Sequence, residues 1–221
     1  MSSTDELVLA LDAAHVRNVL SRLPGEQIRY APETELVDII DSLAALPGGN
    51  DARIIAPRSK IETMVEYRQP TIYAVVHRDG HVLGAQRTKK SVEGRLHGKR
   101  LIGFGGHVGM WDMRRGPLFG TLVTSLMREL EEELGLDRMK CSAEVAGLIC
   151  DDSTDVNRVH LGIVAMVEAP DNFEPYDGEL VNFEWLHASA LVMRLHELES
   201  WSQFVASDLI SVRGFLPRVV R

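Results

Sequence analysis

The sequence is poor in the features that mark three classes of protein. Only two of its 221 residues are cysteine, Cys141 and Cys150, so it lacks the cysteines for a disulfide framework or a CxxC zinc site. No apolar run approaches the roughly 18 residues of a membrane helix. Acidic residues outnumber basic ones by 32 to 24, giving a net charge of −8, which disfavours nucleic acids and anionic membranes. We therefore expect no membrane partner and no stable nucleic acid partner.

The N-terminus also lacks the positive stretch that begins a signal peptide, because it reads MSSTDELVLALDAAHV. This predicts a cytoplasmic protein. The composition, 45% hydrophobic and 25% charged, is that of a globular chain and excludes disordered, collagen-like and repeat classes. The length predicts one domain, alone or with a substantial extension.

The first 62 residues carry no motif. Residues 5–23 and 33–45 favour amphipathic helices, and residues 53–56 favour a short strand. A Pro-Gly-Gly break near residues 47–50 is the best candidate boundary. We accordingly predict a helical N-terminal extension over residues 1–62 and a second domain over residues 63–221.

From residue 70 onward the sequence favours strands more than helices. Residues 71–77 and 81–87 predict two strands joined by the turn Arg78-Asp79-Gly80. The glycine-rich residues 101–108 predict an extended segment. Further strands are predicted over residues 144–150, 159–168 and 181–186, and helices over residues 121–134 and 189–198. Strands interleaved with few helices favour a mixed α/β or α+β sandwich.

The helix over residues 121–134 is the most informative segment. Its leucines recur every four residues and predict an apolar stripe against the core. Thr121 is predicted to cap its N-terminus, and Gly135 to end it in a left-handed conformation.

Three carboxylates, Glu129, Glu132 and Glu133, stand at positions i, i+3 and i+4 beside this stripe. Like charges at this spacing repel, and a hard divalent cation would turn the repulsion into ligation, since Mg²⁺ prefers carboxylate oxygens. The alternative is an ordinary solvated helix face, and the three glutamates alone leave this alternative open.

The residues around the three glutamates favour the metal site over the solvated helix face. Residues 128–136, RELEEELGL, match R-E-U-x-E-E-x-G-U, the second half of the Nudix box, at every defined position, where U is aliphatic. The pair Gly105-Gly106 lies upstream, as that family requires. Over roughly residues 70–198 the chain therefore resembles the Nudix hydrolases.

The first half of the box departs from the family pattern. Counting back from Arg128, Gly120 stands where the early glutamate belongs and Arg114 stands where the leading glycine belongs. If Gly106 is taken as the leading glycine, residues 109–120 become an insertion. Asp112 is the one acid in that insertion. It either substitutes for the missing glutamate or, as we favour here, is an exposed loop aspartate.

The resemblance implies a Nudix-like α/β/α sandwich with a mixed sheet, which cleaves a diphosphate linked to a nucleoside with Mg²⁺ or Mn²⁺. It implies that Glu129, Glu132 and Glu133 are metal ligands and that Arg128 orients them. Glu129 is either a ligand or the group that deprotonates water. The resemblance also implies a homodimer that acts on a small nucleotide-type substrate. The catalytic residues are then Glu129, Glu133, Arg128 and a general base.

For that base we favour Glu179, in the loop before the predicted strand 181–186, over Glu174, Asp177, Asp151 and Asp152. Substrate contacts are assigned with less support. A basic cluster around Arg87 is suited to phosphate, and Trp111 in the insertion is suited to stacking on a base or to a dimer contact. The candidate substrate-binding residues are Arg87, Gly105, Gly106, His107 and Trp111.

Two other functions compete with hydrolysis. A non-catalytic Nudix-fold module that binds nucleotide would explain the altered front half of the box, although it has no need of three mutually repelling acids. A diphosphate isomerase of the isopentenyl type requires a cysteine near Gly105-Gly106-His107, and both cysteines lie after the box. A dinucleotide-binding motif fails as well, because Val108 occupies the position of its third glycine.

Overall fold

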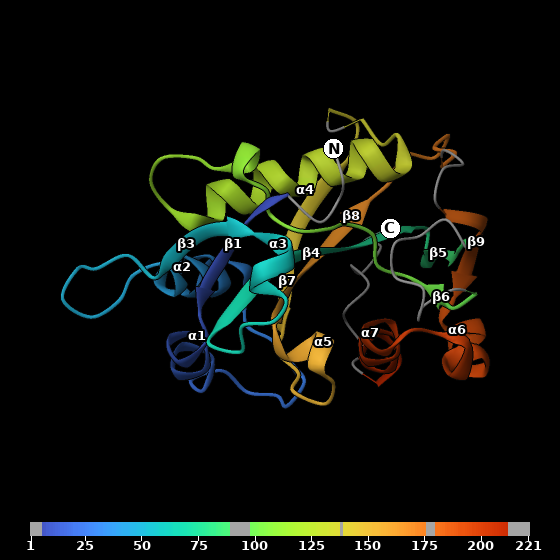
Figure 1. The fold of residues 1–221 in the computed structure, drawn as a ribbon. Coiled ribbons are helices and arrows are strands. Elements are labelled where there is room, and N and C mark those ends of the chain that lie inside the picture. The colour runs from blue at the N-terminus through green and yellow to red at the C-terminus, as the bar shows by residue number, and fades with distance from the viewer. Residues whose placement is uncertain (1–5, 89–97, 138, 176–179, 212–221) are drawn as a thin grey trace. The chain divides into compact units, whose positions relative to one another are not determined.

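The computed structural model describes residues 6–88, 98–137, 139–175 and 180–211 (Figure 1). These residues form two compact units. The first unit consists of Met1–Tyr73, Gly105–Arg128 and Glu144–Ala165. The second unit consists of Ala74–Phe104, Glu129–Ala143 and Met166–Arg221. Residues on both sides of position 62 belong to the first unit, and the predicted division at that position stays a prediction.

Strands and helices alternate along the described part of the chain. The strands are β1 (Leu7–Asp12), β2 (Ile28–Arg29), β3 (Arg53–Pro57), β4 (Tyr67–Arg78), β5 (His81–Arg87), β6 (Arg100–Leu101), β7 (Ser142–Ile149), β8 (His160–Glu168) and β9 (Leu180–His187). The α-helices are α1 (Ala13–Leu20), α2 (Glu33–Leu43), α3 (Arg58–Ile61), α4 (Leu118–Leu134), α5 (Asp155–Arg158), α6 (Ala188–Arg194) and α7 (Ser200–Ser211). Two 3₁₀ turns are η3 (Met110–Asp112) and η4 (Leu195–Glu197).

The strands pair into a mixed sheet, as predicted. Hydrogen bonds join them in the order β2-β7-β8-β4-β1-β3, and β5 pairs with β4, β6 and β9. The pairs β1–β3, β4–β5 and β5–β9 are antiparallel. Strands β4 and β8 run parallel, because Gln69 N–H donates to Val159 O and, further along both strands, Ala169 N–H donates to His77 O.

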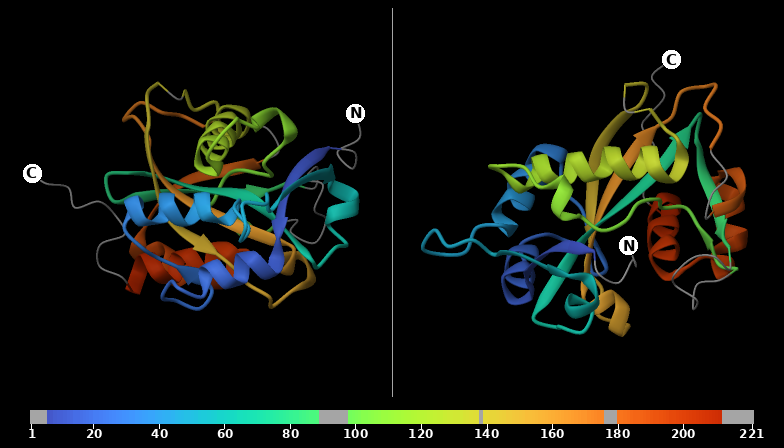
Figure 2. Two further views of the ribbon diagram at one scale, coloured as in Figure 1. Left: turned by 90° about the vertical axis from the view of Figure 1, so that its left-hand side faces the viewer. Right: turned by 45° about the horizontal axis from the view of Figure 1, so that its top comes forward.

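Each unit has helices packed on strands. In the first unit α1 and α2 pack against each other, and they lie on the opposite side of β1 and β3 from the first turns of α4 (Figure 2). In the second unit α6 contacts both β9 and α7. These layers match the predicted Nudix-like sandwich. Within the described ranges, no helix is long and apolar enough to cross a membrane.

The helix predicted over residues 5–23 is wrong in its first part. Residues 7–12 form β1, which pairs with β3 and, at Leu11, with Arg68 of β4. Leu7, Leu9 and Leu11 alternate with period two, which suits a strand. The Asp12 side chain then accepts from His15 N–H and caps α1. The segment before residue 62 therefore adds strands as well as helices.

Helix α4 begins three residues earlier than predicted, at Leu118. Thr121 is therefore not its cap: it is fully buried, and its hydroxyl accepts from Arg114 N–H at 3.0 Å. The predicted C-terminal end is confirmed, since Gly135 has φ +67°. Gly135 N–H donates to Glu131 O at 3.0 Å, the bond of an αL-type helix end.

The other predicted elements are confirmed within a few residues. The hairpin β4–β5 turns through Asp79 and Gly80, both with positive φ, as a two-residue turn requires. The extended segment over residues 101–108 is mostly single bridges, among them Ala74↔Phe104 and Thr71↔His107. Helix α7 was not predicted. Cys141 and Cys150 form no disulfide.

Gly105 lets this segment approach β4 closely. It has φ +133°, and a Cβ added there would lie 2.5 Å from the carbonyl oxygen of Ile72. The next residue, Gly106, accepts a hydrogen bond from Ile72 N–H at 2.9 Å. A side chain at position 105 would therefore collide with the strand backbone and would also strain its own backbone.

We predict that Gly105→Ala lowers the free energy of unfolding by more than the about 1–3 kcal/mol of a strained backbone position, because its Cβ would also collide with the carbonyl oxygen of Ile72. Urea unfolding at fixed pH measures it. Gly116→Ala is the matched control, because Gly116 also has positive φ but a Cβ there meets nothing within 4 Å. Equal losses in the two variants would contradict the close approach.

Candidate active site on helix α4

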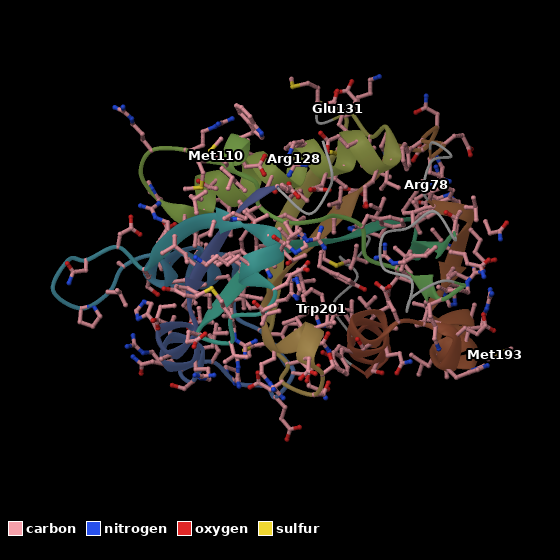
Figure 3. All side chains as sticks on the ribbon, in the orientation of Figure 1. Arg78, Met110, Arg128, Glu131, Met193 and Trp201 are labelled. Atoms are coloured by element: carbon pink, nitrogen blue, oxygen red, sulfur yellow. The ribbon has the colours of Figure 1, made fainter. Side chains whose placement is uncertain are left out.

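Helix α4 places its leucines inward and its glutamates at the edge of the buried face. Leu122, Leu126, Leu130 and Leu134 are at most 5% exposed, which confirms the predicted stripe. Among the acids, Glu129 is 9% exposed, Glu133 is half-buried and Glu132 is exposed. Figure 3 shows the helix with Arg128 and Glu131 labelled.

The donor chemistry of these glutamates fits a hard divalent cation, because one helix edge offers three carboxylates at positions i, i+3 and i+4. Among the described residues, no group of three or more His, Cys, Asp or Glu side chains is assembled closely enough to hold a metal ion. Mg²⁺ does not require such a cage, since one or two carboxylates, water and substrate phosphate complete its coordination.

Arg128 is bound to the insertion. Its Nε and Nη2 donate to the two carboxylate oxygens of Asp112 at 2.9 and 2.8 Å. Nη2 also donates to the carbonyl oxygen of His107 at 3.2 Å. The resemblance assigned Arg128 to orienting the glutamates, and these contacts assign it a second task.

Asp112 is buried rather than exposed. It is 1% exposed and sits in η3, where its Oδ2 also accepts from Gly109 N–H at 2.9 Å. Our expectation of an exposed loop aspartate is therefore wrong. Sequence spacing misled here because Asp112 and Arg128 are sixteen positions apart, and only the folded insertion brings them together.

His107 forms a pair with a residue that the sequence did not single out. Its Nε2 lies 3.0 Å from Nε2 of His160, at the start of β8. Because a carbonyl only accepts, Nδ1 of His160 donates to Val156 O at 2.6 Å. With both rings neutral, Nε2 of His160 is then the acceptor and Nε2 of His107 the donor. Burial is the main cause that lowers the pKa of His107 well below its usual value, and Arg58 and His160 lower it further.

The other predicted substrate residues are dispersed. Arg87, in the second unit, pairs with Glu199 at 3.1 Å. Gly105 and Gly106 pack on β4 as described above. Trp111, in the first unit, is 83% exposed at the surface of the insertion. The structure therefore gives the two glycines a packing role and leaves Trp111 available for contact.

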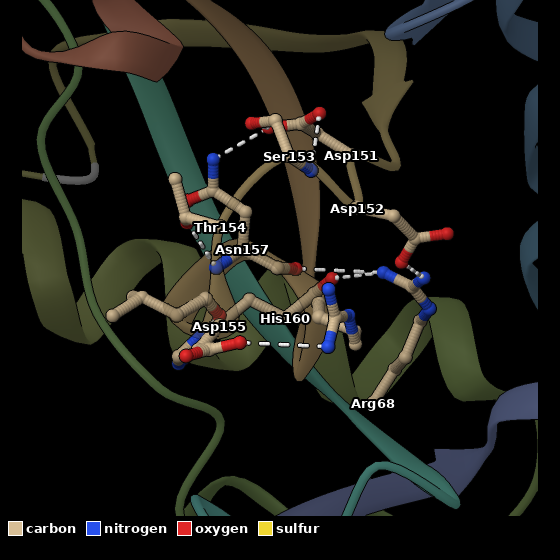
Figure 4. A network of polar contacts seen from close by, with 10 residues as sticks. Arg68, Asp151, Asp152, Ser153, Thr154, Asp155, Asn157 and His160 are labelled. Carbon is tan, nitrogen blue, oxygen red and sulfur yellow. Dashed lines mark hydrogen bonds and ion pairs between the residues drawn. The ribbon is translucent and has the colours of Figure 1, made fainter.

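The candidates for a general base separate into three groups. Glu179 and Asp177 lie outside the described residues, so the prediction for Glu179 stays a prediction. Glu174 is exposed. Asp151 and Asp152 hold a polar network near fully buried Arg68 (Figure 4).

In that network Asp152 binds the Arg68 guanidinium at 2.5 Å, and Asp151 accepts from Asn157 Nδ2 at 2.5 Å and from the Ser153 hydroxyl at 2.6 Å. Arg68 also donates to His160 O at 3.0 Å. These bonds stabilise the turn that precedes α5, which favours a structural role for both aspartates. Nothing in the sequence indicated that Arg68 is buried.

Comparison with known proteins agrees with this architecture. The solved structure of Tm1382, which is assigned to the Nudix hydrolases, superposes with a TM-score of 0.71 at 20% identity, over 93% of this chain and 99% of Tm1382. This likeness shows the fold that the motif predicted. The superposition shows the Nudix fold, and the RELEEELGL helix carries the family's motif on it. No family model matches the chain.

Two further proteins extend the comparison. Protein YmaB of Bacillus subtilis (strain 168) is 33% identical over 157 residues, which are 69% of this chain and 76% of YmaB. At that identity and coverage the two proteins belong to one family. DR0079 from Deinococcus radiodurans matches 75% of this chain and 96% of its own, with a TM-score of 0.52 and 14% identity, and shares the fold.

The lowered pKa of His107 predicts a loss of stability in acid. Unfolded histidine has a pKa near 6.5, so below about pH 6.5 the unfolded chain binds a proton that folded His107 does not. The free energy of unfolding therefore decreases as the pH is lowered below about 6.5, by at most about 1.4 kcal/mol per pH unit for one proton. His107→Gln retains a donor toward His160 but does not titrate, and it should flatten this slope.

Urea unfolding at several pH values between 7.5 and 5 measures the slope. The control is His196→Gln, at an exposed position, which should keep the wild-type slope. If His107→Gln loses stability in acid as steeply as the wild type, the assignment of a neutral buried ring is wrong.

Proposed function

We propose that this protein is a metal-dependent hydrolase that cleaves a diphosphate bond in a substrate linked to a nucleoside diphosphate. The observation that carries the proposal is helix α4. Its RELEEELGL sequence forms a continuous helix with buried leucines and a left-handed end at Gly135. The three glutamates therefore share one edge of a firmly packed helix. The hydrolase names of the Nudix neighbours support the proposal.

In this proposal Glu129, Glu132 and Glu133 hold Mg²⁺ or Mn²⁺. The bound ion would polarise a phosphoryl oxygen and lower the pKa of water. Glu129 is the most buried of the three, so its orientation is set by packing, whereas Glu132 and Glu133 have room to adjust to the ion. The carboxylate charges offset the cation in a protein that is acidic overall.

The proposed substrate class follows from the same argument. A diphosphate completes the coordination of Mg²⁺ and would balance the positive ion. The exposed Trp111 offers an aromatic face for a base. Contact between Arg87 and phosphate would compete with the ion pair of Arg87 to Glu199. We therefore expect Arg87 to contribute less to substrate binding than Trp111. The homodimer and the cytoplasmic location stay predictions.

A non-catalytic nucleotide-binding module is the second candidate. The observation in its favour is the altered first half of the box, with Gly120 in place of the early glutamate. Such a module would bind nucleotide and leave it intact. The two candidates are therefore separated by turnover and not by binding.

The experiment is a hydrolysis assay with a panel of substrates. Nucleoside triphosphates, ADP-ribose, dinucleoside polyphosphates and NADH are each incubated with Mg²⁺ or Mn²⁺, and products are resolved by chromatography. The proposal requires metal-dependent turnover of at least one diphosphate. Binding of a nucleotide without turnover of any would favour the second candidate, and neither binding nor a metal-dependent thermal shift would contradict both.

We predict that Glu132→Gln and Glu133→Gln each lower kcat by about 100-fold or more, because each removes a charged ligand from the ion. Glu132 is exposed and Glu133 is only partly buried, so the melting temperature should change little. Glu131→Gln is the control, since Glu131 is an exposed neighbour on the same helix and stands outside the motif's defined positions. Wild-type kcat in both test variants would refute the ligand assignment.

A further inference from the structure

Two histidines of the second unit face each other across a pair of strands, and the proposed hydrolysis uses neither of them. His81 is the first residue of β5 and His187 is the last residue of β9. They are directly opposite each other in the antiparallel register of these strands, which lie side by side in Figure 1. Their ring centroids are 5.5 Å apart in an edge-to-face arrangement.

The register makes this the closer kind of cross-strand pair. On its other side His81 pairs with Arg78 across the two-residue turn between β4 and β5, so its backbone N–H and C=O point toward β4. His81 and His187 therefore form a non-hydrogen-bonded pair, in which opposite side chains lie closest together and on one face of the sheet. The two strands thus hold both imidazoles in one place.

The hydrogen bond of His81 prepares its ring to bind a metal ion. Its Nδ1 lies 2.9 Å from the carbonyl oxygen of Asp79. Because a carbonyl only accepts, Nδ1 of the neutral ring carries the hydrogen and Nε2 carries the lone pair. Histidines that bind metal ions typically donate their second ring nitrogen to an oxygen in this way.

His187 can adopt the same form by exchanging its tautomer. Its Nδ1 accepts from Ser189 N–H at 3.3 Å, which caps α6, so the hydrogen of the neutral ring is on Nε2. Metal binding at Nε2 would move this hydrogen to Nδ1. There the hydroxyl oxygen of Ser189, at 3.0 Å, can accept it.

The spacing and the donor type indicate which ions fit. Bonds of about 2.0–2.1 Å from two imidazole nitrogens place the ring centroids roughly 5 Å apart around a tetrahedral ion, close to the observed 5.5 Å. Imidazole suits Cu²⁺, Ni²⁺ and Zn²⁺, whereas Mg²⁺ prefers oxygen. Within the described ranges no further His, Cys, Asp or Glu side chain makes the pair a group of three, so water would complete the coordination. His81 is partly buried and His187 is exposed, so an ion can reach them from solvent.

We propose that His81 and His187 form a two-histidine binding site for a divalent transition metal, with Cu²⁺ bound most tightly. The site shares no residue with the glutamates of α4 and does not depend on the proposed function. The bound ion joins the start of β5 to the end of β9. Because the site needs the register of these strands, the ion binds the folded chain and stabilises it.

The test is titration calorimetry of the full chain with Cu²⁺ alone. Two linked binding groups hold a ligand about 10²–10⁴ times more tightly than either group by itself, so His81→Phe and His187→Asn should each raise Kd by about 100-fold. Phenylalanine keeps a ring opposite β9, and asparagine is a favoured N-cap for α6. The double variant should bind no more weakly than either single variant, because the first substitution already removes the chelate.

Two controls define the site. His196→Gln should keep the wild-type Kd, because His196 is another exposed histidine of the second unit. Glu133→Gln should also keep it, which separates this site from the proposed active site. Electron paramagnetic resonance of the bound Cu²⁺ should show two coordinating nitrogens in the wild type and fewer in either test variant.

A wild-type Kd in His81→Phe or in His187→Asn would overturn the proposal, and so would an equal loss of affinity in His196→Gln. If a test variant does not fold, the spectrum of the wild type decides, since bound Cu²⁺ without two nitrogen ligands contradicts the site. A 100-fold loss in Glu133→Gln would assign the Cu²⁺ to α4 and also refute the histidine site, without bearing on hydrolysis.

Discussion

The ion pair between Arg128 and Asp112 links three parts of the chain that the sequence keeps apart. A guanidinium is planar and can donate two parallel hydrogen bonds to a carboxylate, which fixes the orientation of both groups. Here Arg128 of α4 supplies the guanidinium and Asp112 of the insertion supplies the carboxylate. A third hydrogen bond joins Arg128 to the carbonyl oxygen of His107. Removing either partner would break this bidentate pair, so the geometries of α4 and of the insertion depend on each other.

Backbone packing imposes a second constraint on the same region. Gly105 and Gly106 bring the chain against β4, and His107 follows them. The imidazole then meets His160, whose own ring is fixed by Val156 O. The two glycines, which the sequence predicted as substrate contacts, serve in the structure to place a histidine. Residues of a functional motif thus carry part of the packing of the first unit.

The distribution of charge is consistent with a cation site in an acidic protein. Two buried guanidinium groups outside α4 form ion pairs: Arg68 pairs with Asp152, and Arg100 binds Glu184 at 2.9 Å. Those pairs stabilise turns and strand ends. The three glutamates of α4 gather charge of one sign along one helix edge, and in the proposed function a divalent ion would offset that charge.

The sequence by itself determined the local features with strong periodicity: the leucine stripe, the end of α4 at Gly135, the β4–β5 hairpin and the motif that identifies the family. These depend on contacts within a few residues of each other. Tertiary structure decided the rest. Residues 7–12 form a strand because β3 and β4 offer hydrogen bonds to them, which overrides a helical interpretation of the same leucines. Asp112 is buried because Arg128 lies sixteen positions away in sequence but 2.8 Å away in space, a distance that only the folded chain sets.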